Sequence, residues 1–292
     1  MSSVSVTRAA SSDSVRHRAR RDLVAFLALV VLLSAPFEWA IARTGALADT
    51  AGLLLVGPLM LVPALSSVIV RLATRQGFAD VSFRLGPRAR RSVLRSPLLP
   101  LLVGVPTSAI ALVLGLGAVN PPTPAGWVTI VIASLVMNLL LVPGEEIGWR
   151  GFMVTRLVDA GAPAPLLTSG LLWGMWHVPL VLWGGLVTDG PAPWVSTLLM
   201  LVTTASWGYL LARSRMDTGS VWPAIAAHVV WNVLFQAVFE VAVTGRHVGL
   251  WLGEAGVLTA LAITLVAVAS ATLAPPLHRE REASDRLEGM VG

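Results

Sequence analysis

Eight long apolar segments dominate the chain, each close to the length that a helix needs to cross a membrane, which is about 20 residues. Of the 292 residues, 55% are hydrophobic and 13% are charged, whereas an average soluble domain is about 25% charged. We therefore expect an all-α, polytopic membrane protein with about eight transmembrane helices. The predicted segments are Leu23–Ala42, Ala51–Leu72, Pro97–Ala118, Gly126–Pro143, Pro165–Trp183, Trp194–Leu211, Val221–Val243 and Leu250–Leu273.

The arginines predict how these segments are oriented. All 21 residues counted as lysine or arginine are arginine, and most lie in alternate connections between apolar segments. Cytoplasmic loops retain positive charge, so we expect a multi-pass protein of the plasma membrane with both termini in the cytoplasm. Only Arg43 and Arg246 then fall on the outer side. This distribution argues for a lipid bilayer as the partner and against nucleic acid, despite the net charge of +5.

One membrane domain, residues 22–274, is the simplest organisation, between a basic cytoplasmic tail (1–21) and a polar cytoplasmic tail (275–292). Residues before Asp13 and after Arg279 should be loosely attached. The basic stretch Arg16–Arg21 resembles the start of a signal peptide, but repeated later crossings favour an uncleaved first anchor. The segment Gly77–Ser96 predicts a partly ordered loop or a surface helix.

Two adjacent acids follow the fourth apolar segment. Pro143 and Gly144 should bend or open the helix there. If the helix resumes, Glu146 and Arg150 stand at i and i+4 and can form an ion pair. Glu145 then points elsewhere, as an unpaired carboxylate suited to act as a general base. The alternative is an interfacial helix start, where acids favour the helix dipole and the arginine reaches the headgroups.

His177 lies deep within the fifth segment. Trp173, one turn earlier on the same helix face, can wall a pocket beside it. Ionisable groups inside a membrane are costly and usually functional. The alternative is a neutral histidine that packs against a neighbouring helix through a hydrogen bond.

His228 and Asn232 repeat the i, i+4 spacing in the seventh segment, so both side chains project from one face. An imidazole and a carboxamide there can donate two hydrogen bonds to one oxygen, as in an oxyanion hole. Interhelical hydrogen bonding is the alternative. Asn138 is also best explained by interhelical bonding, and Glu38, Glu240 and Glu254 by positions near outer helix ends.

The motifs between residues 142 and 232 together resemble the CPBP or Abi family of intramembrane proteases, which includes the type II CAAX prenyl endopeptidases. The resemblance is carried by Glu145 to Phe152, an aromatic residue four before His177, and His228 with Asn232. It implies a CAAX-protease-like bundle of eight helices with a cavity open to the cytoplasm. Trp173 is a departure, because the family usually has phenylalanine there.

The resemblance also implies roles for the six site residues. Glu145 and His177 would activate water, His228 and Asn232 would stabilise the oxyanion, and Glu146 with Arg150 would shape the site. The expected function is an intramembrane endopeptidase that cuts a peptide or membrane-protein substrate near the cytoplasmic face.

Two questions stay open from the sequence. The first is the cofactor, since one carboxylate and two histidines also form an acceptable zinc set, Glu145, His177 and His228, and a metal-free glutamate mechanism is the alternative. The absence of cysteine excludes thiolate ligands and nucleophiles. The second is catalysis itself, because a non-enzymatic immunity or scaffold protein of the same fold would use the polar residues only to hold helices together.

Overall fold

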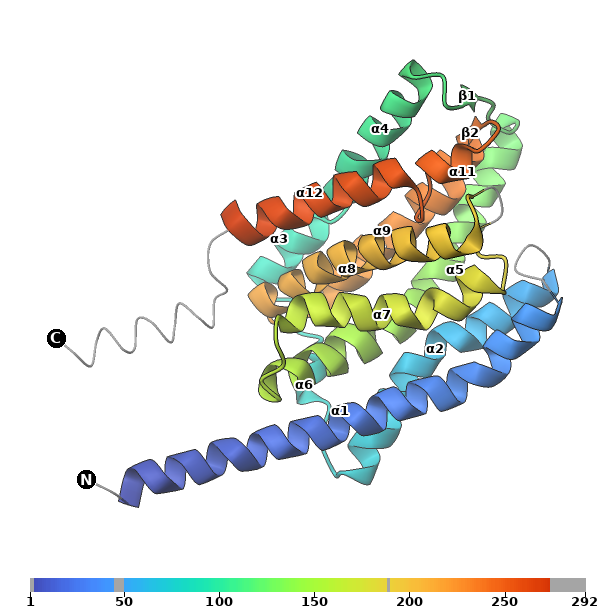
Figure 1. The fold of residues 1–292 in the computed structure, drawn as a ribbon. Helices are drawn as coiled ribbons and strands as arrows, with labels where there is room; N and C mark the ends of the chain where they lie inside the picture. The colour runs from blue at the N-terminus through green and yellow to red at the C-terminus, as the bar shows by residue number, and fades with distance from the viewer. Residues whose placement is uncertain (1–2, 45–49, 188–189, 274–292) are drawn as a thin grey trace.

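A computed structural model describes residues 3–44, 50–187 and 190–273, and these are almost entirely helical (Figure 1). The first half contains α1 (Ser3–Thr44), α2 (Thr50–Ala73), η2 (Ala79–Val81), α3 (Pro87–Arg95), α4 (Leu98–Val113), β1 (Ala118–Val119), α5 (Pro124–Gly148), η3 (Trp149–Met153) and α6 (Val154–Asp159). The second half contains α7 (Pro165–Leu182), α8 (Pro193–Thr218), α9 (Trp222–Leu234), η4 (Phe235–Phe239), α10 (Glu240–Ala242), β2 (Val243–Thr244), α11 (Val248–Trp251) and α12 (Val257–Leu273).

The predicted fold class is confirmed. In the described ranges, 7 helical spans are long and apolar enough to cross a membrane. The eighth predicted segment corresponds to α12, an apolar helix of 17 residues. That segment was expected to begin at Leu250, but the short helix α11 ends at Trp251 and α12 starts only at Val257. Gly253, with a φ of +82°, lies in the break.

The N-terminal region differs from the expectation of a loose tail. Helix α1 begins at Ser3, so the residues before Asp13 and the basic stretch Arg16–Arg21 continue the first membrane helix. A helix that already has many hydrogen-bonded turns extends at little cost, and this explains the difference. The predicted C-terminal tail, residues 275–292, lies outside the described residues.

The helix also continues through Pro143, where a bend or an opening was expected. Helix α5 runs unbroken to Gly148, and the irregularity comes one turn later, as the π-helical segment η3. The backbone N–H of Val154 there donates to the carbonyl of Trp149, five residues back. Single π-turns inside α-helices are frequent at functional sites, and this one follows directly after the two acids.

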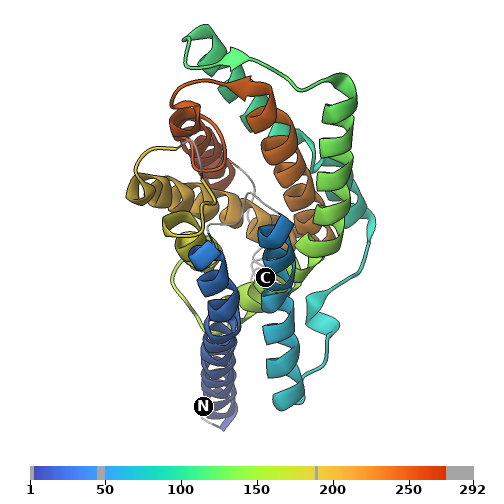
Figure 2. The same cartoon turned by 90° about the vertical axis from the view of Figure 1, so that its right-hand side faces the viewer.

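Close packing between α5 and α2 fixes the position of the acids. A Cβ atom on Gly148 would lie 2.6 Å from the carbonyl oxygen of Pro63, and one on Gly144 would lie 2.8 Å from that of Met60. Only glycine therefore allows the two backbones to approach so closely, as in other small-residue helix contacts in membranes. In Figures 1 and 2, α1 and α2 lie side by side on one flank of the bundle.

A short antiparallel ribbon joins two connections at one end of the bundle. Strand β1 pairs with β2, with Ala118 opposite Thr244 and Val119 opposite Val243. The ribbon therefore holds the connection between α4 and α5 against the end of α10. The main hydrophobic core lies between the long helices and includes Trp149, Phe152, Trp207 and Phe235.

Candidate active site

One cavity of about 680 Å³ lies between the helices of the bundle, and four predicted site residues line it: Glu145 from α5, His177 from α7, and His228 and Asn232 from α9. Cavities of this size hold a drug-sized ligand or several residues of a peptide. Three membrane helices, distant in sequence, thus present a carboxylate, two imidazoles and a carboxamide to a single space.

Glu145 lies against Trp173, the aromatic residue one helical turn before His177. The Trp173 Nε1–H donates a hydrogen bond of 2.9 Å to Oε2 of Glu145. The Trp173 ring also lies edge-on to His177 and to His228, with ring centroids 5.3 and 5.1 Å apart. Trp173 therefore contacts three of the four cavity-lining candidates and fixes one carboxylate oxygen of Glu145.

Glu146 points away from the cavity into a fully buried charged cluster. Its Oε1 accepts from Nη1 of Arg150 and from Nδ1 of His228, each at 2.8 Å, and both charged side chains of the ion pair are 0% exposed. The ion pair expected from the i, i+4 spacing is thus present. The guanidinium of Arg150 also lies 4.4 Å from the centre of the Trp173 ring. The cluster lies directly behind the cavity and anchors His228.

His177 has a defined hydrogen bond on one side of its ring. Its Nδ1 lies 2.9 Å from the carbonyl oxygen of Trp173, one turn earlier. A carbonyl only accepts, so Nδ1 carries the hydrogen of the neutral ring, and Nε2 keeps its lone pair. The histidine therefore combines a fixed orientation with an unprotonated nitrogen.

The amide of Asn232 is held by an interhelical hydrogen bond. Its Nδ2 donates to Oδ1 of Asn138 at 2.8 Å, and Asn138 in turn donates to Ser134 on its own helix. The expectation that Asn138 makes an interhelical bond is confirmed. An amide nitrogen carries two hydrogens, so Asn232 retains a second N–H after this contact.

The three candidate metal ligands do not form a ready metal site in this structure. Within the parts of the chain that the structure describes, no group of three or more histidine, cysteine, aspartate or glutamate side chains is placed to hold a metal ion. Nδ1 of each histidine and Oε2 of Glu145 take part in hydrogen bonds, so the ligating atoms that remain are Nε2 of His177 and His228 and Oε1 of Glu145.

The sequence did not link two further acids to this cavity. Glu240 and Glu254, expected as helix-end groups, both line it. Oε1 of Glu254 accepts from Nε1 of Trp231 at 2.9 Å, and its backbone N–H donates to Oε1 of Glu240 at 3.2 Å. Sequence spacing gives little signal for this contact, because it depends on the non-helical break before α12.

Fold and site together define a class: multi-pass helical membrane proteins that enclose ionisable side chains in a cavity between helices. A protein-family model described as type II CAAX prenyl endopeptidase Rce1-like matches residues 124–234. This match confirms the resemblance to the CPBP and CAAX protease family, and the matched region spans α5 to α9 with all six predicted site residues. It supports a protease of the CAAX type. A comparison with curated proteins found no match.

Proposed function

We propose that this protein is an intramembrane endopeptidase in which Glu145 is the general base. The observation that carries the proposal is the shared cavity, where Glu145, His177, His228 and Asn232 meet. Glu145, assisted by the free Nε2 of His177, would take a proton from a water molecule that attacks a peptide carbonyl, and this proton would pass to the leaving amine as the C–N bond breaks. Positioned acid–base groups of this kind contribute about 10²–10⁴-fold to a rate.

His228 and Asn232 would hold the oxyanion formed by that attack. For His228 to donate from Nε2 while Nδ1 donates to Glu146, the ring must carry both protons. The buried carboxylate of Glu146 lies 2.8 Å from Nδ1, in position to accept its hydrogen. Asn232 adds its second amide hydrogen. Glu146 and Arg150 therefore act by holding His228, without entering the cavity themselves.

The substrate we propose is a peptide with an apolar group or segment. Most of the cavity wall is apolar, with Val56, Met60, Ile130, Met137 and Leu180 among its residues. The matching family is described as a type II CAAX prenyl endopeptidase, and we propose a prenylated peptide as the first substrate to test. We also propose that cleavage occurs near the cytoplasmic face of the plasma membrane, with both termini in the cytoplasm, since the arginine-rich connections favour that orientation.

The test uses purified, full-length protein in lipid vesicles and two quenched fluorescent peptides of identical sequence, one farnesylated on its cysteine and one not. Cleavage of either peptide by the wild type, and its loss in Glu145→Ala, His177→Ala and His228→Ala, is the expected result. Cleavage of the farnesylated peptide alone would identify the prenyl group as a determinant. Failure of the folded wild type to cleave either peptide would contradict the proposal and favour a scaffold or immunity protein, as would loss of folding in all three variants.

A further inference from the structure

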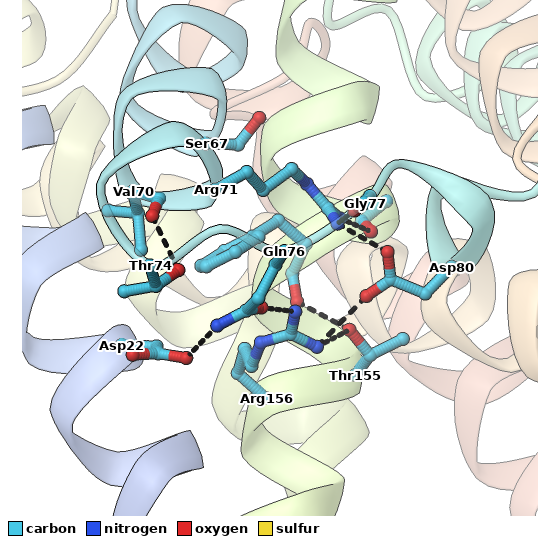
Figure 3. A network of polar contacts seen from close by, with 12 residues as sticks. Asp22, Ser67, Val70, Arg71, Thr74, Gln76, Gly77, Asp80, Thr155 and Arg156 are labelled. Carbon is cyan, nitrogen blue, oxygen red and sulfur yellow. Dashed lines mark hydrogen bonds and ion pairs between the residues drawn. The ribbon is translucent and has the colours of Figure 1, made fainter.

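The loop from Gly77 to Phe83 is linked to both sides of the Glu146–His228 hydrogen bond. It is connected through Arg71 to the π-turn that follows Glu146, and it bonds directly to the start of α9, the helix that carries His228. This loop, between α2 and α3, carries the single acid Asp80 and the short helix η2. Figure 3 shows Asp80 directed toward the guanidinium groups of Arg71 and Arg156, which come from α2 and α6. None of these three residues lines the cavity described above, so any effect they have on it is indirect.

On the α5 side, the contact runs through Arg71. This side chain is fully buried and is paired with Asp80, and its Nη1 also donates to the carbonyl of Gly77 at 2.7 Å. Its Nη2 donates to the carbonyl of Gly151 at 3.1 Å. Gly151 lies inside the π-turn η3, so Arg71 connects the loop to the irregular backbone that follows the two acids.

The π-turn is also held around one aromatic ring. The guanidinium groups of Arg71 and Arg156 lie 5.0 and 4.7 Å from the centre of the Phe152 ring. Oδ2 of Asp80 accepts from Arg156 at 2.9 Å, and its other oxygen accepts from Arg71. One carboxylate therefore bridges the two cations that enclose Phe152.

From the π-turn, the contacts continue to the catalytic candidates. Gly151 follows Arg150, whose Nη1 donates to Glu146, and the same Glu146 oxygen accepts from His228. A shift of the π-turn would move Arg150 and change where Glu146 meets the imidazole.

On the α9 side, the same loop holds the start of the helix that carries His228. The backbone N–H of Val221 donates to the carbonyl of Ser82 at 3.1 Å, and Nε1 of Trp222 donates to the carbonyl of Phe83 at 2.9 Å. At the end of α8, Nη2 of Arg215 donates to the backbone carbonyl of Asp80 at 2.6 Å. The loop therefore fixes the beginning of α9 as well as the π-turn.

We propose that Asp80 and Arg71 are positioning residues that set the register between Glu146 and His228 through the π-turn at Gly151. The kinetic test of this inference rests on the proposed function. The structural test does not depend on activity. Removing the Asp80 carboxylate leaves Arg71 as a buried cation without its counterion, which is costly. The loop then loses its ion-pair link to the π-turn, while its backbone bonds to the start of α9 remain.

The kinetic test compares Asp80→Ala with a matched control, Asp159→Ala. Asp159 is also an acid near Arg156, at 4.0 Å, but Asp80 alone pairs with Arg71. We expect Asp80→Ala to lower kcat by about 10²-fold, the scale of a 1 Å misplacement, and to change KM by no more than about twofold. Asp159→Ala should match the wild type. If Asp80→Ala does not fold, Asp80→Asn removes only the charge.

The structural test uses pulsed electron spin resonance on the chain, whose lack of cysteine leaves introduced labels unambiguous. Spin labels on the cysteines of Asp159→Cys in α6 and Asp217→Cys in α8 report the distance between these two helices across the Gly77–Phe83 loop. The control is the doubly labelled protein with Asp80 intact, because it lacks the Asp159 carboxylate just as the tested variant does. We expect a broader or shifted distance distribution only when Asp80→Ala is added.

The outcomes separate this inference from the proposed function. A changed distance in Asp80→Ala without peptide cleavage by any variant would keep the positioning role and overturn the peptidase. An unchanged distance distribution would overturn the positioning role. So would a kcat of Asp80→Ala equal to that of Asp159→Ala, or a loss of rate that only follows a loss of folded protein.

Discussion

The indole of Trp173 donates its hydrogen to Glu145 at 2.9 Å, a contact that a phenylalanine at this position could not make. The bond fixes one carboxylate oxygen and leaves the other available. Both site histidines make T-shaped contacts with the same ring. Trp173 therefore adds a polar contact to the aromatic wall that the sequence predicted.

Trp173→Phe should retain the fold and lose part of the activity. The aromatic wall stays, but Glu145 loses a hydrogen bond, which for a charged group contributes about 1.5–3 kcal/mol. We expect kcat to fall about tenfold, well short of the ~10²–10⁴-fold that a positioned base contributes. Steady-state kinetics with the farnesylated peptide checks this, and an unchanged kcat would show that the indole does not orient Glu145.

The two adjacent glutamates should differ sharply in their effect on stability. Glu146→Ala removes the ion-pair partner of the fully buried Arg150, and breaking such a pair costs about 3–5 kcal/mol. Glu145→Ala removes a cavity-lining group and should leave the thermal midpoint in detergent close to that of the wild type. Tryptophan fluorescence during heating measures both variants. Equal destabilisation by the two substitutions would contradict the separate roles assigned to them.

Chelation should not abolish cleavage. The described residues present no group of three histidine, cysteine, aspartate or glutamate side chains placed to hold a metal ion. Activity after treatment with EDTA and gel filtration should equal that of untreated protein. A loss of activity that zinc restores would overturn this prediction and return the metal set to consideration.

The stabilising effect of Asp80 should persist until strongly acidic pH. Burial alone raises the pKa of Asp80, but hydrogen bonds and charges from Arg71 and Arg156 outweigh it, so the pKa lies below its ordinary value of 3.8. Because the pKa of Asp80 is lower in the folded protein than in the unfolded chain, its carboxylate stabilises the fold at any pH above the unfolded-state pKa. This stabilisation is lost as the pH falls through the folded-state pKa.

The measurement is the difference in thermal midpoint between the wild type and Asp80→Asn. It should be constant from neutral pH to about pH 5 and should shrink only below about pH 3.8. A difference that disappears near pH 6 would place the titrating group elsewhere.

Local spacing predicted the contacts that a single helix makes. Glu146 and Arg150 are four residues apart, so their ion pair followed from helical geometry alone. The same periodicity placed His228 and Asn232 on one face, and both line the cavity. The length of the apolar segments predicted the bundle, because a membrane leaves a helix few alternatives.

The contacts between distant segments were not predictable in this way. The Glu146–His228 and Trp173–Glu145 bonds join residues 82 and 28 positions apart, and their existence depends on how whole helices pack. The π-turn at Trp149–Met153 has no spacing signal, and the pairing of Asp80 with Arg71 depends on a loop in which Ser82 adopts a φ of 61°. Tertiary packing decides such features.

The most direct test of the account is cleavage by purified Glu145→Gln in lipid vesicles, followed by mass spectrometry of the products. The amide keeps the volume of the side chain and an oxygen that can accept from Trp173, but it cannot act as a base. The account predicts a fall in kcat/KM of about 10²–10⁴-fold, with a thermal midpoint equal to that of the wild type. Cleavage at the same bond and at a rate near that of the wild type would contradict it.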